Sequence, residues 1–220
     1  DSSTGRSAAT QDAPEGRHFY GHGVFSRDGA WLFTTENDYE AGTGRVGVWD
    51  VAAGFARAAE FASGGIGPHA IKRLPGTDTL VVANGGIDTH PDSGRTKLNI
   101  PTMQPNLTYL VDGRMIETVS LAADEQKNSI RHLAVARNGA VAFGMQWQGD
   151  APSPPLVGLH RLGDAPQLLS IGTDALRQLQ GYVGSIAFAG NDTQIIATSP
   201  RGGIIQHYDV GGRAYTSQTE

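Results

Sequence analysis

The sequence predicts an all-β protein built from repeated units of strands. One pattern occurs four times: a polar residue at the entrance of a short apolar strand, a turn with glycine, asparagine or aspartate, and a second apolar strand. The four entrances are His22, His69, His132 and Ser185, so the pattern returns after 47, 63 and 53 residues. Strand-only repeats of about 40–50 residues are typical of the blades of a β-propeller. Period-two alternation without a sustained helical period supports the same class.

The blades follow one another along the chain. Residues 1–16 are small, polar and non-periodic, and we expect them to form a linker or the end of a preceding blade. The expected blades span about 17–65, 66–127, 128–180 and 181–215. Propellers with blades this diverse usually have more than four of them. We therefore expect this chain to be part of a larger wheel.

Within these blades the later strands and the loops can be placed. The expected third strands are 45–51, 106–111, 156–162 and 204–210, and the expected fourth strands of the first three blades are 56–61, 115–121 and 167–171. The longest insertion is 85–105, and a shorter, proline-rich connection follows at 147–155. Residues 173–180 are compatible with one or two helical turns, with Thr173 as the N-cap.

The composition excludes several classes of function. The net charge of −5 and the lack of a basic stripe argue against a nucleic-acid surface. No apolar run approaches the roughly 18 residues of a membrane span. The chain has no cysteine, which excludes disulfides, thiolate ligands and cysteine nucleophiles and suits an oxidising compartment.

The blade geometry predicts one polar face around the axis. The first strand of each blade lies innermost, and antiparallel strands reverse direction, so first-strand entrances and second-strand exits share a face. We therefore expect His22, His69 and His132 to converge on an axial mouth. The polar residues expected around them are Glu36, Asn37, Asn84, Gln146, Tyr182, Ser185 and Arg201.

Three neutral imidazoles that meet on an axis suit a borderline metal such as copper, zinc or iron. The same histidines could bind an anion if protonated, or donate hydrogen bonds to an oxygen-rich ligand. The structural alternative is that each histidine satisfies backbone carbonyls at its strand entrance and holds the blades together. His160 and His207 fall in third strands, away from the axis, and we expect them at the surface or between blades.

No catalytic motif is present. The sequence has no Gly-x-Ser-x-Gly, no phosphate-binding loop and no pattern of nucleophile and base. A lactonase-like hydrolase would need a metal with an open coordination position and a nearby base. Glu36 is the one carboxylate that the expected geometry places for that role.

Several segments together resemble the bacterial family of unknown function DUF1513. The resemblance extends over about residues 17–210. The segments that carry it are His18–Phe25, Thr35–Asp38, Gly67–His69, Val82–Ile87, Asn128–Ala134 and Ser199–Gly202.

This resemblance implies an exported, periplasmic, seven-bladed propeller that is longer than this chain at both ends. Family members tend to be encoded beside imelysin-like proteins and a di-haem oxidoreductase, which implies a role in iron or other metal acquisition. The family has no assigned catalytic residue, so none is carried over.

The sequence thus favours a non-enzymatic periplasmic propeller whose axial histidine face binds a metal, a metal-containing ligand or a partner protein in metal uptake. An interaction scaffold with structural histidines is the first alternative, and a metal-dependent hydrolase of the lactonase type is the second.

Overall fold

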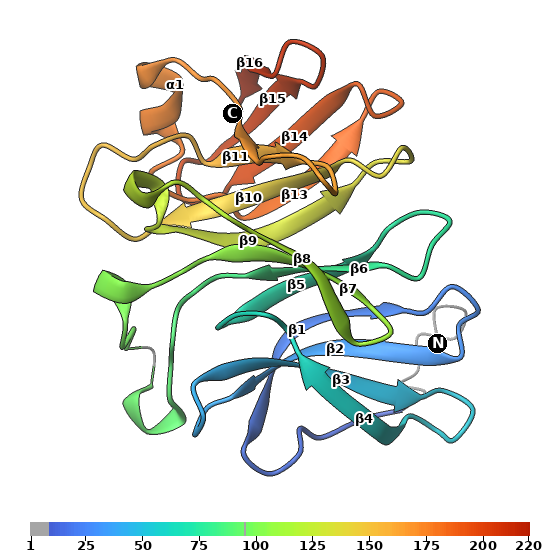
Figure 1. The fold of residues 1–220 in the computed structure, drawn as a ribbon. Helices are drawn as coiled ribbons and strands as arrows, with labels where there is room; N and C mark the ends of the chain where they lie inside the picture. Colours follow the sequence, from blue (N-terminus) through green and yellow to red (C-terminus); the bar gives the residue numbers. More distant parts are fainter. Residues whose placement is uncertain (1–8, 95) are drawn as a thin grey trace.

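The computed structural model describes residues 9–94 and 96–220, and it confirms the all-β propeller class. The described chain forms four separate four-stranded antiparallel sheets, which succeed one another along the sequence from blue to red (Figure 1). Of the expected linker 1–16, residues 1–8 lie outside the described residues, and 9–16 hold no strand or helix.

Each sheet is one blade, with its strands in sequence order from the axis outward. The first blade contains β1 (Arg17–Phe25), β2 (Trp31–Asp38), β3 (Thr43–Asp50) and β4 (Ala56–Ala62). The second contains β5 (Pro68–Arg73), β6 (Leu80–Asn84), β7 (Asn106–Val111) and β8 (Arg114–Ser120). The third contains β9 (Asn128–Val135), β10 (Val141–Trp147), β11 (Val157–His160) and β12 (Gln167–Leu168). The fourth contains β13 (Ser185–Ala189), β14 (Gln194–Ser199), β15 (Ile204–Asp209) and β16 (Ala214–Thr219).

The innermost strands define the axis. Strand β1 contacts β5, β5 contacts β9, and β9 contacts β13, so the entrances of the four blades lie next to one another. Three one-turn 3-10 helices, η1 (Pro91–Ser93), η2 (Ile100–Thr102) and η3 (Ala123–Glu125), lie in the connections. The α-helix α1 (Thr173–Gln178) follows the third blade.

One local expectation was wrong, and one strand was not predicted. The helix begins after Gly172, which is its N-cap, and Thr173 is its first helical residue. The fourth blade ends in the additional strand β16, which the sequence pattern did not reveal because its residues are polar on both faces. An outermost strand needs no buried face, so alternation does not mark it.

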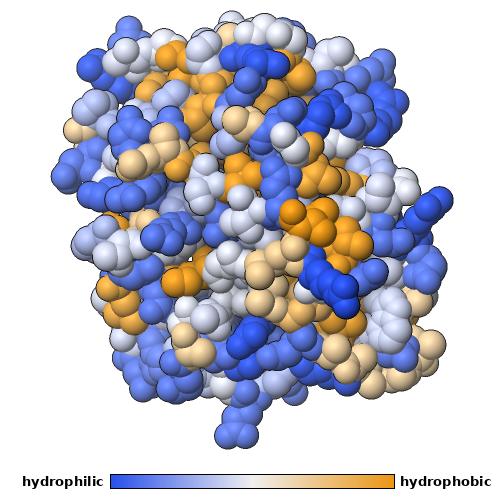
Figure 2. Space-filling model, viewed as in Figure 1, coloured by the Kyte–Doolittle hydropathy of each residue, from blue (hydrophilic) through white to orange (hydrophobic). Residues whose placement is uncertain are grey.

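Apolar side chains hold neighbouring blades together. Each inter-blade layer joins residues of the central strands of two sheets, as Val81 and Tyr109 of the second blade pack with Phe143 of the third. A similar cluster lies between the third and fourth blades, and a smaller one between the first and second. On the face shown in Figure 2, apolar residues form several small patches separated by polar residues.

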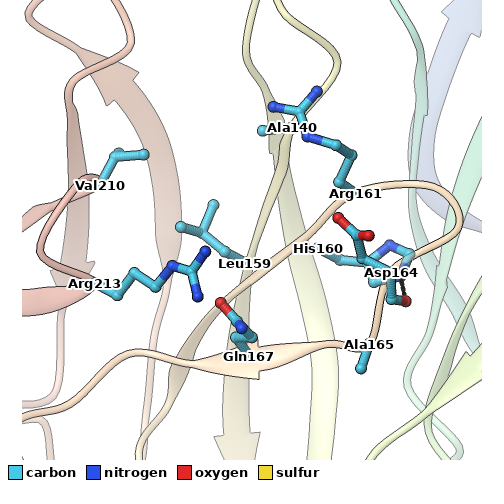
Figure 3. Close-up of a pocket in the computed structure, with 9 residues that line it drawn as sticks. All are labelled: Ala140, Leu159, His160, Arg161, Asp164, Ala165, Gln167, Val210 and Arg213. Atoms are coloured by element: carbon cyan, nitrogen blue, oxygen red, sulfur yellow. Dashed lines mark hydrogen bonds between the residues drawn. The ribbon is translucent and has the colours of Figure 1, made fainter.

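His160 lies between two blades, one of the two positions that we expected for it. Its Nε2 lies 2.8 Å from the carbonyl oxygen of Asp164, and because a carbonyl only accepts, this nitrogen carries the proton. Its Nδ1 therefore accepts from the hydroxyl of Tyr109, 2.6 Å away on the second blade. His160 and Asp164 also border a cavity of about 410 Å³, which the third blade shares with Val210 and Arg213 of the fourth (Figure 3).

We expect Tyr109→Phe to lower the free energy of unfolding by about 1–3 kcal/mol, because it leaves a buried imidazole nitrogen without a partner. Urea denaturation followed by tryptophan fluorescence would measure the change. Tyr215→Phe, on the half-buried strand β16, is the matched control and should shift stability by about 0.5 kcal/mol or less. Equal effects of the two substitutions would contradict the assigned role of the Tyr109–His160 hydrogen bond.

Candidate metal centre

A β-bulge lies at the entrance of each of the three histidine-bearing blades. The ladder between first and second strands loses its register within residues 19–23, 68–70 and 130–132. The first strand of the fourth blade, which carries Ser185, pairs with its neighbour without such a shift. A bulge inserts an extra residue and redirects side chains. The histidines thus sit where the innermost strands are locally bent.

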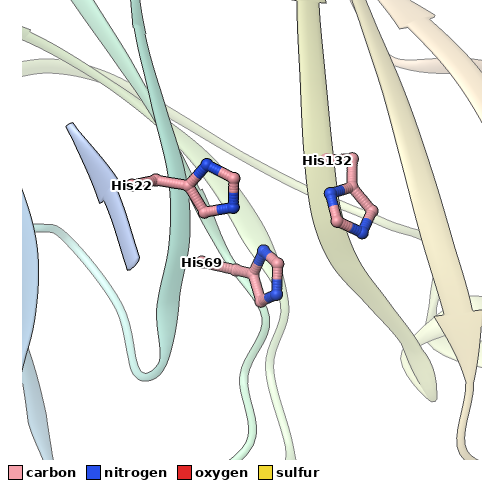
Figure 4. Close-up of side chains that lie close together, drawn as sticks. All are labelled: His22, His69 and His132. Atoms are coloured by element: carbon pink, nitrogen blue, oxygen red, sulfur yellow. The ribbon is translucent and has the colours of Figure 1, made fainter. Parts of the chain in front are cut away.

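The structure brings His22, His69 and His132 together (Figure 4). Their ring centroids are 4.8 Å apart for His69 and His132, 5.2 Å for His22 and His69, and 6.2 Å for His22 and His132. One ring nitrogen from each can be chosen so that all three lie within 4.8 Å of one another. No carboxylate of the described residues belongs to this group. We call these three residues the histidine cluster.

The tautomer of one histidine in the cluster, His69, is fixed by a hydrogen bond. His69 Nδ1 lies 2.9 Å from the carbonyl oxygen of Arg131. A carbonyl can only accept, so Nδ1 carries the proton and Nε2 keeps its lone pair. A second ring nitrogen held by a backbone carbonyl is the usual arrangement of a metal-binding histidine. This hydrogen bond also ties the second blade to the third, as the structural alternative requires.

The environment keeps the three imidazoles neutral. Burial lowers the pKa of His69 to about 3, with further contributions from Arg131 and the other two histidines. Burial, together with His22 and Arg131, lowers the pKa of His132 to about 4. The pKa of His22 is lowered by burial and by Lys72. Neutral imidazole is the metal-binding form, and the lowered pKa values reduce competition from protons.

The donor set fits a first-row metal ion. Three neutral nitrogen ligands with an open position are one of the standard zinc arrangements, and copper and iron also accept imidazole. A tetrahedral zinc site has nitrogen–nitrogen separations of about 3.3 Å. The nitrogens of the cluster are up to 4.8 Å apart, so closure needs each ring to move by about 0.8 Å.

The structure gives Glu36 a different role from the expected base. Its carboxylate is fully buried and receives two hydrogen bonds from Arg57, at 2.9 and 2.8 Å, and one from Thr34 at 2.7 Å. The side chain lies over Gly47 of the neighbouring strand, where any Cβ would collide with it. The ion pair with Arg57 and the hydrogen bond from Thr34 engage this carboxylate, which a lactonase-like site would need as a free base.

Asn37 and Asn84 are also buried, at the exits of β2 and β6. Asn84 accepts from Ser63 Oγ at 2.7 Å and donates to Asn106 Oδ1 at 2.8 Å, which holds the segment between the first two blades against the second. Asn37 donates to the carbonyl of Thr89 in the long loop, 3.4 Å away. Both amides therefore bond to neighbouring segments of the fold.

Gln146 and Tyr182 join the third blade to the entrance of the fourth. The two residues form an isolated β-bridge, and Gln146 also donates to the carbonyl of Val183 at 3.4 Å. The guanidinium of Arg201 lies over the ring of Tyr182, 4.6 Å from its centroid. Ser185 is exposed at the start of β13. Tyr182 and Arg201 thus form a polar rim on the fourth blade.

Sequence reasoning missed two cations on this face, Arg131 and Lys97. Arg131 directly precedes His132, and plain alternation would have turned it away from the axis. Lys97 lies in the long insertion, whose path no periodicity predicts. Its Nζ contacts Gln148 Oε1 of the third blade.

A propeller whose axis carries a cluster of three histidines is the class that the fold and the site define. The chain belongs to the family described as "Protein of unknown function (DUF1513)", whose model matches residues 1–220. The resemblance found in the sequence is therefore confirmed.

Two solved structures are similar to this chain in fold. Kuenenia stuttgartiensis hydrazine synthase matches with a TM-score of 0.55 and 12% identity, over 86% of this chain and 64% of that one. The dihydro-heme d1 dehydrogenase NirN in complex with DHE matches with a TM-score of 0.61 and 13% identity, over 91% of this chain and 36% of that one. This chain thus spans less than two thirds of either. A comparison with the curated proteins finds no match.

None of the helices in the described part of the chain has the length and apolar character needed to cross a bilayer.

Proposed function

We propose that this protein is a non-enzymatic periplasmic β-propeller that binds a metal ion, or a metal-containing ligand, through the histidine cluster, as part of iron or other metal uptake. The observation that carries the proposal is the convergence of three neutral imidazoles from three blades within 4.8 Å. The hydrogen bond from His69 Nδ1 to the Arg131 carbonyl supports it, because it leaves Nε2 free as a donor to a metal.

The wider setting comes from the family. The periplasmic location, and a partner of the imelysin-like or di-haem kind, are what the family resemblance implies. One similar structure is named as a dehydrogenase of dihydro-heme d1, so an iron tetrapyrrole belongs among the ligands to be tried. At 13% identity, that likeness shows the fold alone.

Metal analysis tests the proposal directly. The protein is incubated with copper, zinc or iron, desalted and measured by inductively coupled plasma mass spectrometry. We expect about one ion per chain in the wild type and a loss of at least tenfold in affinity for each single His→Ala change in the cluster. The variant His22→Ala/His69→Ala/His132→Ala should retain no metal.

The matched control is His207→Ala, a half-buried histidine of β15 outside the cluster, which should bind like the wild type. Circular dichroism confirms that each variant is folded. If the triple variant does not fold, the single variants decide the matter. Equal metal content in the wild type and in all cluster variants, or no metal in any of them, would overturn the proposal and leave a scaffold with structural histidines.

A further inference from the structure

The histidine cluster lacks negative charge. Its three ligands are neutral, so a bound divalent ion would keep its full formal charge. The charged side chains that act on the imidazoles are Lys72 and Arg131, both positive. No carboxylate of the described residues joins the cluster. A buried metal charge without a compensating anion is strongly unfavourable, so an anion is needed beside the ion.

Three cations lie on the face where the first strands begin, and one of them, Arg131, adjoins the histidine cluster. Arg131 is on β9 directly before His132, Lys97 comes from the long insertion, and Arg201 follows β14. We call Lys97, Arg131 and Arg201 the rim cations. Arg201 stacks on Tyr182, and Lys97 contacts Gln148, whose Nε2 donates to the carbonyl of Gln146 at 2.9 Å.

The rim cations are close enough to act on one another. The pKa of Lys97 is lowered by burial and then by the positive charges of Arg131 and Arg201. Within residues 9–94 and 96–220, no carboxylate lies within 4.0 Å of any of the three. By contrast, Arg17, Arg45 and Arg57 of the first blade are all paired with acidic side chains.

Arg131 has unused donors and space beside it. Its Nε donates to Ser129 Oγ at 3.0 Å, and no acceptor among the described residues lies within hydrogen-bond distance of its two terminal nitrogens. A small cavity of about 50 Å³ is lined by Arg131, Tyr20, Gly67, Gly85, Ile87 and Thr89. The volume accommodates a group of a few non-hydrogen atoms, such as a carboxylate.

We propose that the rim cations bind an oxyanion, foremost a carboxylate, at the entrance face beside the histidine cluster, so that the ligand of this face is an anionic metal complex. Arg131 supplies a planar fork of two donors, which matches a carboxylate better than a point charge does. Lys97 and Arg201 add charge at the entrance. The metal part of this inference rests on the proposed function, whereas the anion part rests on the rim cations alone.

Isothermal titration with succinate, and separately with inorganic phosphate, tests the anion site in the metal-free protein. We expect succinate to bind the wild type and to bind at least 30-fold more weakly to Lys97→Gln/Arg131→Gln/Arg201→Gln. Arg27→Gln/Arg114→Gln/Arg213→Gln, which removes three exposed charges elsewhere, is the control of equal net charge and should bind like the wild type. Stronger binding of phosphate than of succinate would assign the site to phosphate esters.

If the triple rim variant does not fold, the melting temperature of the wild type and of a single variant provides a second test. Succinate should raise the melting temperature of the wild type more than sodium chloride of equal ionic strength does, and Arg201→Gln alone should reduce that rise. Binding that is equal in the rim variant and its control, or no binding of either anion to the wild type, would overturn the inference.

Metal binding and anion binding can be tested separately. With zinc present, succinate affinity should rise at least tenfold in the wild type, and zinc affinity should rise by the same factor with succinate, because linkage is reciprocal. His22→Ala/His69→Ala/His132→Ala should lose this increase and keep the metal-free anion affinity. Anion binding without any metal binding would reject the proposed function and retain the anion site.

Discussion

Arg57→Met is expected to lower the free energy of unfolding by about 3–5 kcal/mol, because it leaves the fully buried carboxylate of Glu36 without its positive partner. The Thr34 hydroxyl would remain as a donor to that carboxylate, but a single neutral donor does not replace a bidentate guanidinium. Chemical denaturation at pH 7, followed by circular dichroism, measures the difference.

A compensating variant separates lost charge pairing from lost packing. Glu36→Met/Arg57→Met removes both charges and should recover more than half of the stability lost by Arg57→Met, since a buried ion pair is often replaceable by apolar groups of similar volume. The control is Arg177→Ala, whose exposed ion pair with Asp174 should contribute about 0.5 kcal/mol or less. No recovery in the double variant would show that Arg57 acts through its stacking on Trp49 instead.

Acid is expected to destabilise the metal-free protein through the histidine cluster. Folding lowers the pKa of His69 from 6.5 to about 3 and that of His132 to about 4. Above pH 6.5 both histidines are neutral in the folded and in the unfolded state, so they do not make the free energy of unfolding depend on pH. Below pH 6.5 the unfolded chain takes up protons that the native state does not, so stability falls as the pH drops from 6.5 towards 4. After allowance for partial solvent contact, we expect a loss of about 2–4 kcal/mol.

The variant His69→Gln/His132→Gln should show a flatter dependence of unfolding free energy on pH across this range. His207→Gln, outside the cluster, should follow the wild-type slope. Urea titrations at half-unit steps of pH, in the presence of a chelator, give both curves. Parallel curves for the wild type and the double variant would mean that the imidazoles are solvated and that burial does not hold them neutral.

The fold could be predicted because its determinants are local. Turn residues and apolar alternation repeat at each blade, and the antiparallel order then places His22, His69 and His132 on one face without knowledge of any long-range contact. Strand β16 was not predicted, because an outermost strand needs no apolar face.

The partners of the polar residues could not be predicted in the same way. Glu36 meets Arg57, 21 residues away on the outermost strand of its blade, and alternation assigns a side chain to a face without naming its partner. Arg131 reaches the cluster because of a bulge, and no signal in a single sequence marks the extra residue of a bulge.

The three bulged strand entrances belong to three sheets that share no common ladder. An ion held by His22, His69 and His132 would therefore act as a cross-link between repeat units, closing chain segments of 47 and 63 residues. Closing long segments removes many conformations of the unfolded chain. The ion that the protein binds would then also stabilise the contacts between its blades. Release of the ion would weaken those contacts, while each sheet kept its own hydrogen bonds.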